Sequence, residues 1–174
     1  MTYHHTRRAH RGIHVSLWAV VACATIEPVA AVGLAQQTPQ PRPIEAALNL
    51  LYWPPDETPN IVVVNQRPPA VSALAEGWVV RNSDGSARPT IYIAGWSKPY
   101  RDALANPLAS RSHSVIRLAG VLAHERSHLR YGPDEESAYA AQLTTLVILQ
   151  APDVEISNVR RALESVKQRQ RARH

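Results

Sequence analysis

Residues 122–129 read Leu-Ala-His-Glu-Arg-Ser-His-Leu and contain the pattern H-E-x-x-H inside an apolar run. On a helix, side chains four positions apart share a face, so His124 and His128 can direct their imidazoles toward one metal ion. Glu125 projects to the side of that pair, where a carboxylate can hold and deprotonate a water bound to the metal. This stretch therefore predicts a metal centre built on a single helix.

The sequence on both sides of the motif predicts a buried helix with a sharp end. Val115, Leu118 and Leu122 recur at helical spacing, which is typical of the apolar face of a helix. Gly132 and Pro133 follow the second histidine, and this pair indicates a C-terminal stop and a change of direction. We therefore expect the chain to fold back after the motif.

Three acidic residues, Asp134, Glu135 and Glu136, open a second apolar-periodic run directly after that turn. A carboxylate in the first turn of a second helix can fold back toward the histidines, and a catalytic zinc site commonly uses two His and one Glu. Acidic residues are also favoured at helix N-termini in general, so the cluster has an ordinary structural explanation as well. The residues themselves leave open which carboxylate joins the imidazoles.

His124, Glu125 and His128, followed by Glu135 in an E-x-x-A pattern, resemble the zincin metallopeptidases over residues 90–150. The resemblance implies a Zn²⁺ ion held by His124, His128 and Glu135, with Glu125 as the general base. One departure is that Glu135 stands only seven residues after His128, whereas the familiar enzymes place this ligand much further along the chain.

Asp134 and Glu136 are the alternatives for the third ligand. A second zincin class uses H-E-x-x-H-x-x-G-x-x-H or -D, and Asp134 stands at its final position. The glycine of that pattern is displaced by one, because Tyr131 occupies its place and Gly132 follows. We therefore place Glu135 first, Asp134 second and Glu136 third.

The N-terminal part of the chain predicts export. Residues 1–35 combine a basic start without acids, an apolar stretch and small residues before Gln36, which is the layout of a signal peptide. The single cysteine, Cys23, lies inside this stretch, so a membrane association would require its acylation. Residues 36–43 read as a proline-rich linker. We expect a periplasmic or secreted protein, with a lipid anchor at Cys23 as the alternative.

Basic residues concentrate at the two ends of the chain. The formal net charge is +5, yet residues 36–159 hold 10 basic and 12 acidic side chains. This distribution argues against a nucleic-acid surface. We expect one domain over residues 44–166 and a basic, solvated tail over residues 167–174.

The pattern predicts an α/β (α+β) zincin-like domain with a small, partly antiparallel sheet, an active-site helix and two following helices. Short helices are expected over residues 44–52, 68–76 and 100–105, and strands over residues 61–64, 78–81 and 90–93. By the zincin resemblance, Thr90 to Gly95 would form an edge strand that binds an extended substrate. An ordinary sheet strand is the alternative.

Two further polar residues are candidates for the site. Tyr139 can donate a hydrogen bond to a developing oxyanion, although its place in an apolar stripe favours core packing. His113 lies before the active helix, where a capping or surface role is expected.

The predicted function is zinc-dependent hydrolysis of a peptide bond in a peptide or protein substrate, with no nucleic-acid partner. Two other functions remain open from the sequence. The first is a zinc protein without catalytic activity, and the second is a metal-free exported interaction module.

Overall fold

The computed structural model describes residues 42–106 and 111–172, and this part of the chain folds as a mixed α+β structure. The predicted signal peptide, Cys23 and most of the predicted linker lie outside the described residues. The elements, in chain order, are α1 (Arg42–Leu51), the 3-10 turn η1 (Pro55–Glu57), β1 (Asn60–Val64), β2 (Gly77–Arg81), β3 (Ala87–Ala94), α2 (Lys98–Ala105), α3 (His113–Tyr131), α4 (Glu135–Ile148) and α5 (Asp153–Arg171). The predicted coarse fold class is confirmed.

The sheet has three strands in the order β1-β3-β2, with β1 parallel and β2 antiparallel to β3. A partly antiparallel sheet was expected from the sequence, and this expectation is confirmed. Alternate residues of β3 point to opposite faces, and Ile91 and Ile93 are fully buried in the core. The prediction that Thr90 to Gly95 forms an edge strand is wrong, because β3 pairs with a neighbour on both sides and β2 is an edge instead.

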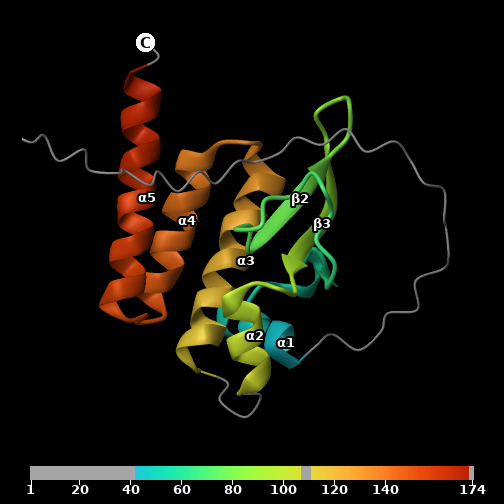
Figure 1. Ribbon diagram of the computed structural model, residues 1–174, viewed down its shortest axis with the longest axis vertical. Helices are drawn as coiled ribbons and strands as arrows, with labels where there is room; N and C mark the ends of the chain where they lie inside the picture. Colours follow the sequence, from blue (N-terminus) through green and yellow to red (C-terminus); the bar gives the residue numbers. More distant parts are fainter. Residues whose placement is uncertain (1–41, 107–110, 173–174) are drawn as a thin grey trace, which may run out of the picture.

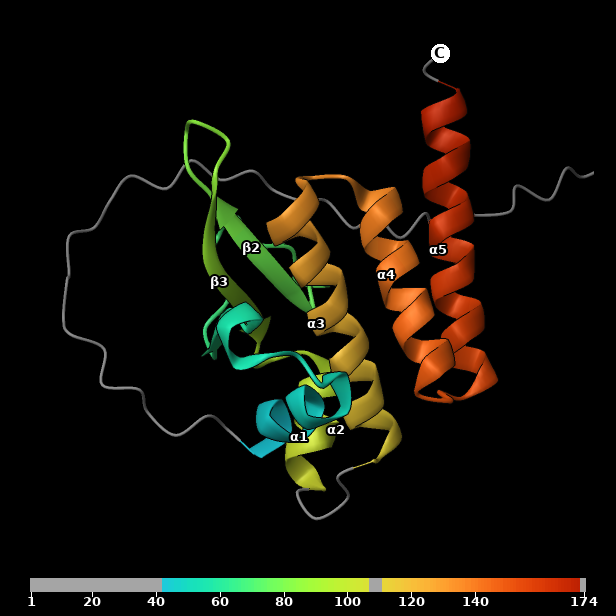
Figure 2. The same ribbon diagram turned by 180° about the vertical axis from the view of Figure 1, so that it is seen from behind.

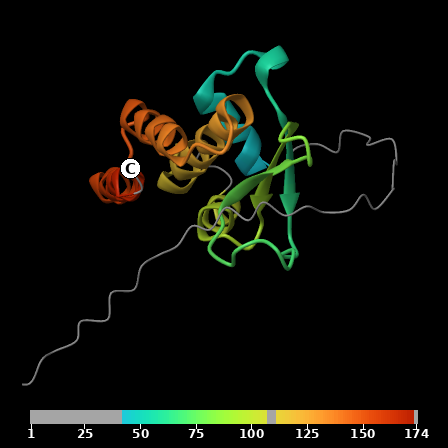
Figure 3. The ribbon, with the colours of Figure 1, turned by 90° about the horizontal axis from the view of Figure 1, so that it is seen from above.

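Helix α3 lies in the middle of the molecule, with the sheet on one side and α4 and α5 on the other (Figure 1). The view from above shows the same order from the sheet through α3 and α4 to α5 (Figure 3). Helices α1 and α2 lie against the first half of α3 (Figure 2). Because α3 has neighbours on several sides, it is buried along most of its length, and Glu125, Ser127 and His128 are buried with it.

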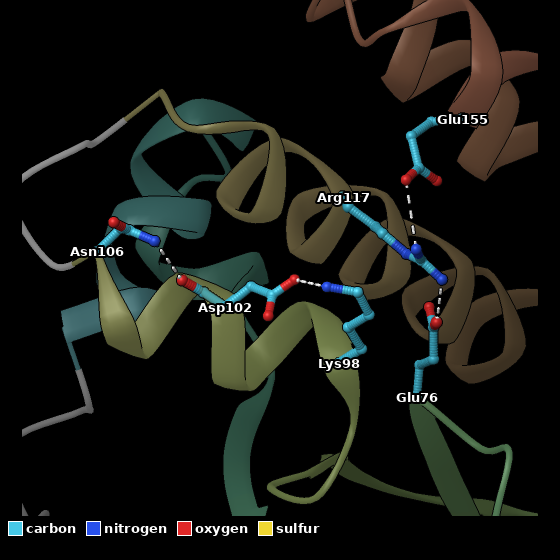
Figure 4. Close-up of polar contacts among 6 residues, drawn as sticks. All are labelled: Glu76, Lys98, Asp102, Asn106, Arg117 and Glu155. Carbon is cyan, nitrogen blue, oxygen red and sulfur yellow. Dashed lines mark hydrogen bonds and ion pairs between the residues drawn. The ribbon is translucent and has the colours of Figure 1, made fainter.

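An ionic cluster ties α3 to the beginning of β2 and of α5. The guanidinium of Arg117 donates to Glu76 and, at 3.3 Å, to Glu155 (Figure 4). Glu76 directly precedes β2, and its carbonyl accepts a hydrogen bond from Ala94 N at 3.0 Å. These contacts hold the start of β2 against α3, two helical turns before the H-E-x-x-H motif.

Three local predictions differ from the structure. Residues 68–76 form two separate turns rather than a helix, closed by hydrogen bonds from Val71 N to Pro68 O at 3.0 Å and from Ala75 N to Ser72 O at 3.1 Å. Helix α1 begins at Arg42, so the last two residues of the predicted linker belong to it. Helix α5 continues to Arg171, so the predicted basic tail over residues 167–171 forms its last turns, in which Gln168, Arg169 and Arg171 are exposed to solvent. Val166 packs inward there, and the flanking Lys167 is partly buried.

None of the described helices combines the length and the apolar character that a membrane span requires.

Candidate metal centre

The turn between α3 and α4 brings the H-E-x-x-H motif and the acidic cluster together. Gly132 ends α3 with φ of 90°, a conformation that side-chain-bearing residues rarely adopt, and its N–H donates to His128 O at 3.2 Å. Arg81 of β2 donates to the same carbonyl at 2.5 Å. The chain then reverses within two residues, so α4 runs back along α3. The predicted reversal is confirmed.

Two imidazole nitrogens and the two oxygens of one carboxylate converge where the two helices face each other. His128 Nε2 lies 3.1 Å from His124 Nε2, and Glu135 approaches with Oε2 at 3.6 Å from His124 Nε2 and Oε1 at 3.5 Å from His128 Nε2. Among the described residues, this is the group of His, Cys, Asp and Glu side chains that could hold a metal ion. The cluster is enclosed, since 5% of the His128 side chain is exposed.

The imidazole nitrogens and the Glu135 carboxylate face one another with no cationic side chain of the described residues between them. His128 Nδ1 lies 3.1 Å from the carbonyl oxygen of Gly132, which can only accept, so Nδ1 carries a proton and a neutral His128 presents the lone pair of Nε2. Glu135 Oε1 is buried and has no hydrogen-bond partner in the described part of the chain. Lone pairs from three residues therefore face one point, and only a proton or a metal cation can satisfy them together.

The spacing of these atoms fits a small tetrahedral cation. Ligands at 2.0–2.2 Å from a tetrahedral ion lie about 3.3–3.6 Å from one another. The two nitrogens lie 3.1 Å apart, and the two oxygens of Glu135 lie 3.6 and 3.5 Å from one nitrogen each. With one ligand atom from each residue, the three atoms lie within 4.8 Å of one another, so the side chains would draw closer around an ion. A donor set of two imidazoles and one carboxylate is also one that divalent metals accept in proteins. The residues present therefore fit a metal ion.

Asp134 and Glu136, the alternative third ligands, have other places in the structure. Asp134 is the N-cap of α4, and its carboxylate accepts hydrogen bonds from the backbone of Glu136 and Ser137, both at 3.2 Å. The side chain of Glu136 lies toward Lys167 on the far side of α4. Because Asp134 is occupied by capping, Glu135 in the first helical position is the acid that turns toward the imidazoles.

Burial and mutual repulsion control the charge of the two histidines. Burial, followed by the neighbouring His128, lowers the pKa of His124 to about 4. Burial also acts to lower the pKa of His128, but the Glu135 carboxylate at 3.5 Å, the charge of Glu125 and the Gly132 carbonyl outweigh it and raise that pKa. The cluster without a metal therefore favours one shared proton, carried by His128, while His124 stays neutral.

Glu125 points away from α4 and toward the sheet, where it lies beneath Gly77 of β2. A Cβ atom on Gly77 would be 3.0 Å from Glu125 Cγ and 3.3 Å from Glu125 Oε1, so a glycine is required for this close approach. Burial raises the pKa of Glu125 to about 8, with His128 lowering and Glu135 raising it by smaller amounts. The carboxyl group therefore stands between the imidazole cluster and the edge strand β2.

The two remaining sequence candidates lie where packing explains them. The ring of Tyr139 contacts His124 edge to face, with 4.7 Å between centroids, and packs against the core. Burial raises the pKa of Tyr139, so its hydroxyl stays protonated and remains a hydrogen-bond donor. His113 is exposed at the first position of α3, about 16 Å along the helix from His124.

The sequence reading missed two residues that shape the cluster. Gly77 makes room for Glu125, and Gln142 of α4 is a buried amide that packs against Gly120, one helical turn before His124. Gln142 is seven residues after Glu135, two helical turns along the same face, and it interrupts an apolar stretch. That spacing was a usable signal for Gln142, whereas the role of Gly77 depends on how the sheet meets α3.

The fold and the cluster define a mixed α+β protein with a His124, His128 and Glu135 group that could hold a metal ion. No family model matches the sequence, and no similar curated protein or solved structure was found. The functional argument therefore rests on the chemistry of the described residues.

Proposed function

We propose that this protein is a zinc-dependent hydrolase of peptide bonds with a zincin-like site, in which His124, His128 and Glu135 hold the metal. The observation that carries the proposal is the convergence of two imidazole nitrogens and one carboxylate at 3.1–3.6 Å, with a buried Glu135 oxygen that has no other described partner. Zinc suits this group because it accepts nitrogen and oxygen ligands in tetrahedral sites and keeps one position open in enzymes.

Glu125 is the proposed general base. A bound zinc would supply Lewis acidity, which polarises a carbonyl and lowers the pKa of a water to about 7. Glu125 directly follows His124 and precedes His128 by three residues, and it is oriented toward β2, outside the three-ligand cluster. In that position its carboxylate would accept the proton of the attacking water and then give it to the leaving amine.

Strand β2 replaces β3 as the proposed support for an extended substrate. Its outer edge has no strand partner among the described residues, and it runs beside α3 at the level of Glu125 (Figure 1). An extended peptide can add to such an edge through backbone hydrogen bonds. Gly77 would then place the peptide backbone next to the proposed base, because no side chain stands between them.

A zinc site without catalysis is the second candidate function, and the burial of Glu125 favours it. Only 6% of Glu125 is exposed, so the carboxyl group lies beneath β2 rather than in an open cleft. A peptidase would need β2 or its flanking turns to shift and admit a water and a substrate. A purely structural site would need no such movement.

The test combines metal analysis with proteolysis on the full chain. The protein is stripped with a chelator, reloaded with zinc, and incubated with a reduced, unfolded protein substrate. We expect about one zinc per chain, and Glu125→Gln should keep the zinc while cleavage falls by about 10²–10⁴-fold, because the proton acceptor is lost. The matched control is Glu164→Gln, which changes an exposed glutamate of α5 and should alter neither property.

Glu135→Ala should remove stoichiometric zinc as well as cleavage. A Glu125→Gln variant that cleaves at the wild-type rate would contradict the assigned base. Zinc binding without cleavage of any unfolded substrate would favour the non-catalytic alternative, and a chain that binds no zinc would overturn both.

A further inference from the structure

Helix α5 is the outermost layer of the described structure. It packs against α4 on the side away from the sheet (Figure 3). Its inward face is apolar, with Val159, Leu163 and Val166 buried. Its exposed surface carries four arginines, which are Arg160, Arg161, Arg169 and Arg171. The helix therefore presents a basic surface to the outside of the molecule.

Positive charge is concentrated in the second half of α5. Residues 160–172 hold five basic side chains and one acid, a net charge of +4. Residues 42–159 hold 10 basic and 12 acidic side chains, a net charge of −2. The single acid of the helix end, Glu164, forms an ion pair with Lys167 at 3.5 Å. The four arginines therefore carry the excess charge, and they lie on one side of the molecule.

The partners of these arginines leave their charges uncancelled. Arg161 donates to the amide oxygen of Asn158 at 2.5 Å, and Arg169 donates to the hydroxyl of Ser165 at 2.8 Å. Both partners are neutral and lie on the same helix. None of the ion pairs among the described residues involves the four arginines. Their guanidinium groups remain available to an external anion.

Apolar side chains are exposed at the other end of the same helix pair. Ile148, the last residue of α4, is 70% exposed, and Val154 in the first turn of α5 is 62% exposed. Val154 and Arg161 are seven residues apart, so they share one face of α5. A lipid interface accommodates both arginines and exposed apolar side chains, whereas a nucleic-acid phosphate backbone offers the apolar side chains no partner.

We propose that the outward face of α5 binds a membrane surface rich in anionic phospholipids. The arginines would contact lipid phosphates, which match the two-pronged geometry of a guanidinium, while Ile148 and Val154 enter the interface. A basic side chain near such a surface contributes about fivefold to the partition coefficient. The contact needs no spanning helix. It is independent of the proposed zinc site, because α4 lies between α5 and α3 (Figure 3).

The test compares two variants of the full chain that have the same net charge. The first replaces Arg160, Arg161, Arg169 and Arg171 of α5 by Gln. The matched control replaces four exposed arginines of other elements by Gln, which are Arg42, Arg67, Arg88 and Arg101. Partition is measured by co-sedimentation with vesicles of phosphatidylcholine and phosphatidylglycerol, and pure phosphatidylcholine vesicles provide the neutral surface. Thermal unfolding verifies that each protein is folded.

We expect wild type to bind the anionic vesicles, to ignore the neutral ones, and to dissociate as the salt concentration rises. The α5 variant should bind about 10²–10³-fold more weakly, and the control variant should stay within a few-fold of wild type. Wild type that does not bind anionic vesicles would overturn the inference. So would an equal loss in both variants, because net charge alone would then explain binding.

A third variant tests whether the occupant is a membrane. Ile148→Ser combined with Val154→Ser should weaken vesicle binding by about three- to tenfold, because two apolar side chains no longer enter the interface. Binding to duplex DNA serves as the comparison. DNA binding that is tighter than vesicle binding and unchanged in this variant would overturn the membrane surface in favour of a nucleic acid.

Discussion

Helix α3 carries two enclosed polar clusters that differ in their balance of charge. In the first half of the helix, the guanidinium of Arg117 lies between the carboxylates of Glu76 and Glu155 (Figure 4). Two turns further on, the two imidazoles of the motif face Glu135, with Glu125 beside them. The Arg117 cluster contains its own permanent cation. The histidine cluster contains none, because the pKa of His124 is lowered to about 4 and its atoms share at most one proton.

This difference in charge balance suits the two clusters to different functions. A guanidinium stays charged and has several donors in fixed directions, so it satisfies its carboxylates and stabilises the helix contacts. Lone pairs that converge without a donor are costly to bury, unless an external ion completes them. The Arg117 cluster is therefore a structural link, while the histidine cluster has the properties of a binding site.

The largest expected effect on stability comes from breaking the Arg117 cluster. Arg117→Met would leave Glu76 and Glu155 close together without a cation, in a site where burial already raises the pKa of Glu76. We expect a loss of about 2–3 kcal/mol, below the usual cost for a fully buried pair because a third of the Arg117 side chain is exposed. Urea unfolding measures the loss.

We expect folded Arg117→Met to bind zinc with unchanged affinity, because the Arg117 cluster supports the fold and does not contact the proposed metal position. Adding Glu76→Gln should recover part of the stability, since it removes one of the two uncompensated carboxylates. A large drop in zinc affinity would show that the two clusters are coupled.

A smaller effect is expected from pH on the metal-free histidine cluster. The pKa of Glu125 is raised from 4.5 to about 8, so the folded protein holds a proton that the unfolded chain has lost at neutral pH. The stabilisation from this proton is complete below pH 4.5 and is lost as the pH rises toward 8. Between pH 6.5 and 8 the difference amounts to about 2 kcal/mol.

Glu125→Gln should remove that part of the pH dependence. The measurement is the unfolding free energy of chelator-treated wild type and variant at both pH values. His128, whose pKa is also raised, contributes in the same direction, and its contribution should fall in the variant because the charge of Glu125 is one cause of that raised pKa. Parallel pH profiles for the two proteins would contradict the buried, protonated state of Glu125.

The smallest expected effect comes from an exposed ion pair of α2. Lys98 pairs with Asp102 one turn later, and both side chains are largely in solvent (Figure 4). Lys98→Ala should change the unfolding free energy by less than about 0.5 kcal/mol, as is usual for surface pairs. Thermal or urea unfolding measures it. A loss as large as that of Arg117→Met would mean that burial does not explain the difference between ion pairs in this protein.

Much of the centre is local and was therefore predictable from the sequence. The four-residue spacing of His124 and His128 puts both rings on one helix face in any fold that keeps the helix. Gly132 and Pro133 predict the reversal, because glycine tolerates the positive φ that ends α3 and proline cannot continue it. The choice of Glu135 over Asp134 was less accessible, since it required knowing that Asp134 serves as the N-cap.

The sequence by itself determined the motif helix, the turn, the strands and the pair of imidazoles, because these depend on contacts within a few residues. Only the tertiary structure decided that β3 is central and β2 is the edge, that Gly77 covers Glu125, and that Leu146 and Gln142 of α4 pack against Gly120. These features join segments that are distant in the chain. Their geometry depends on which faces pack together, and no local pattern of residues specifies that choice.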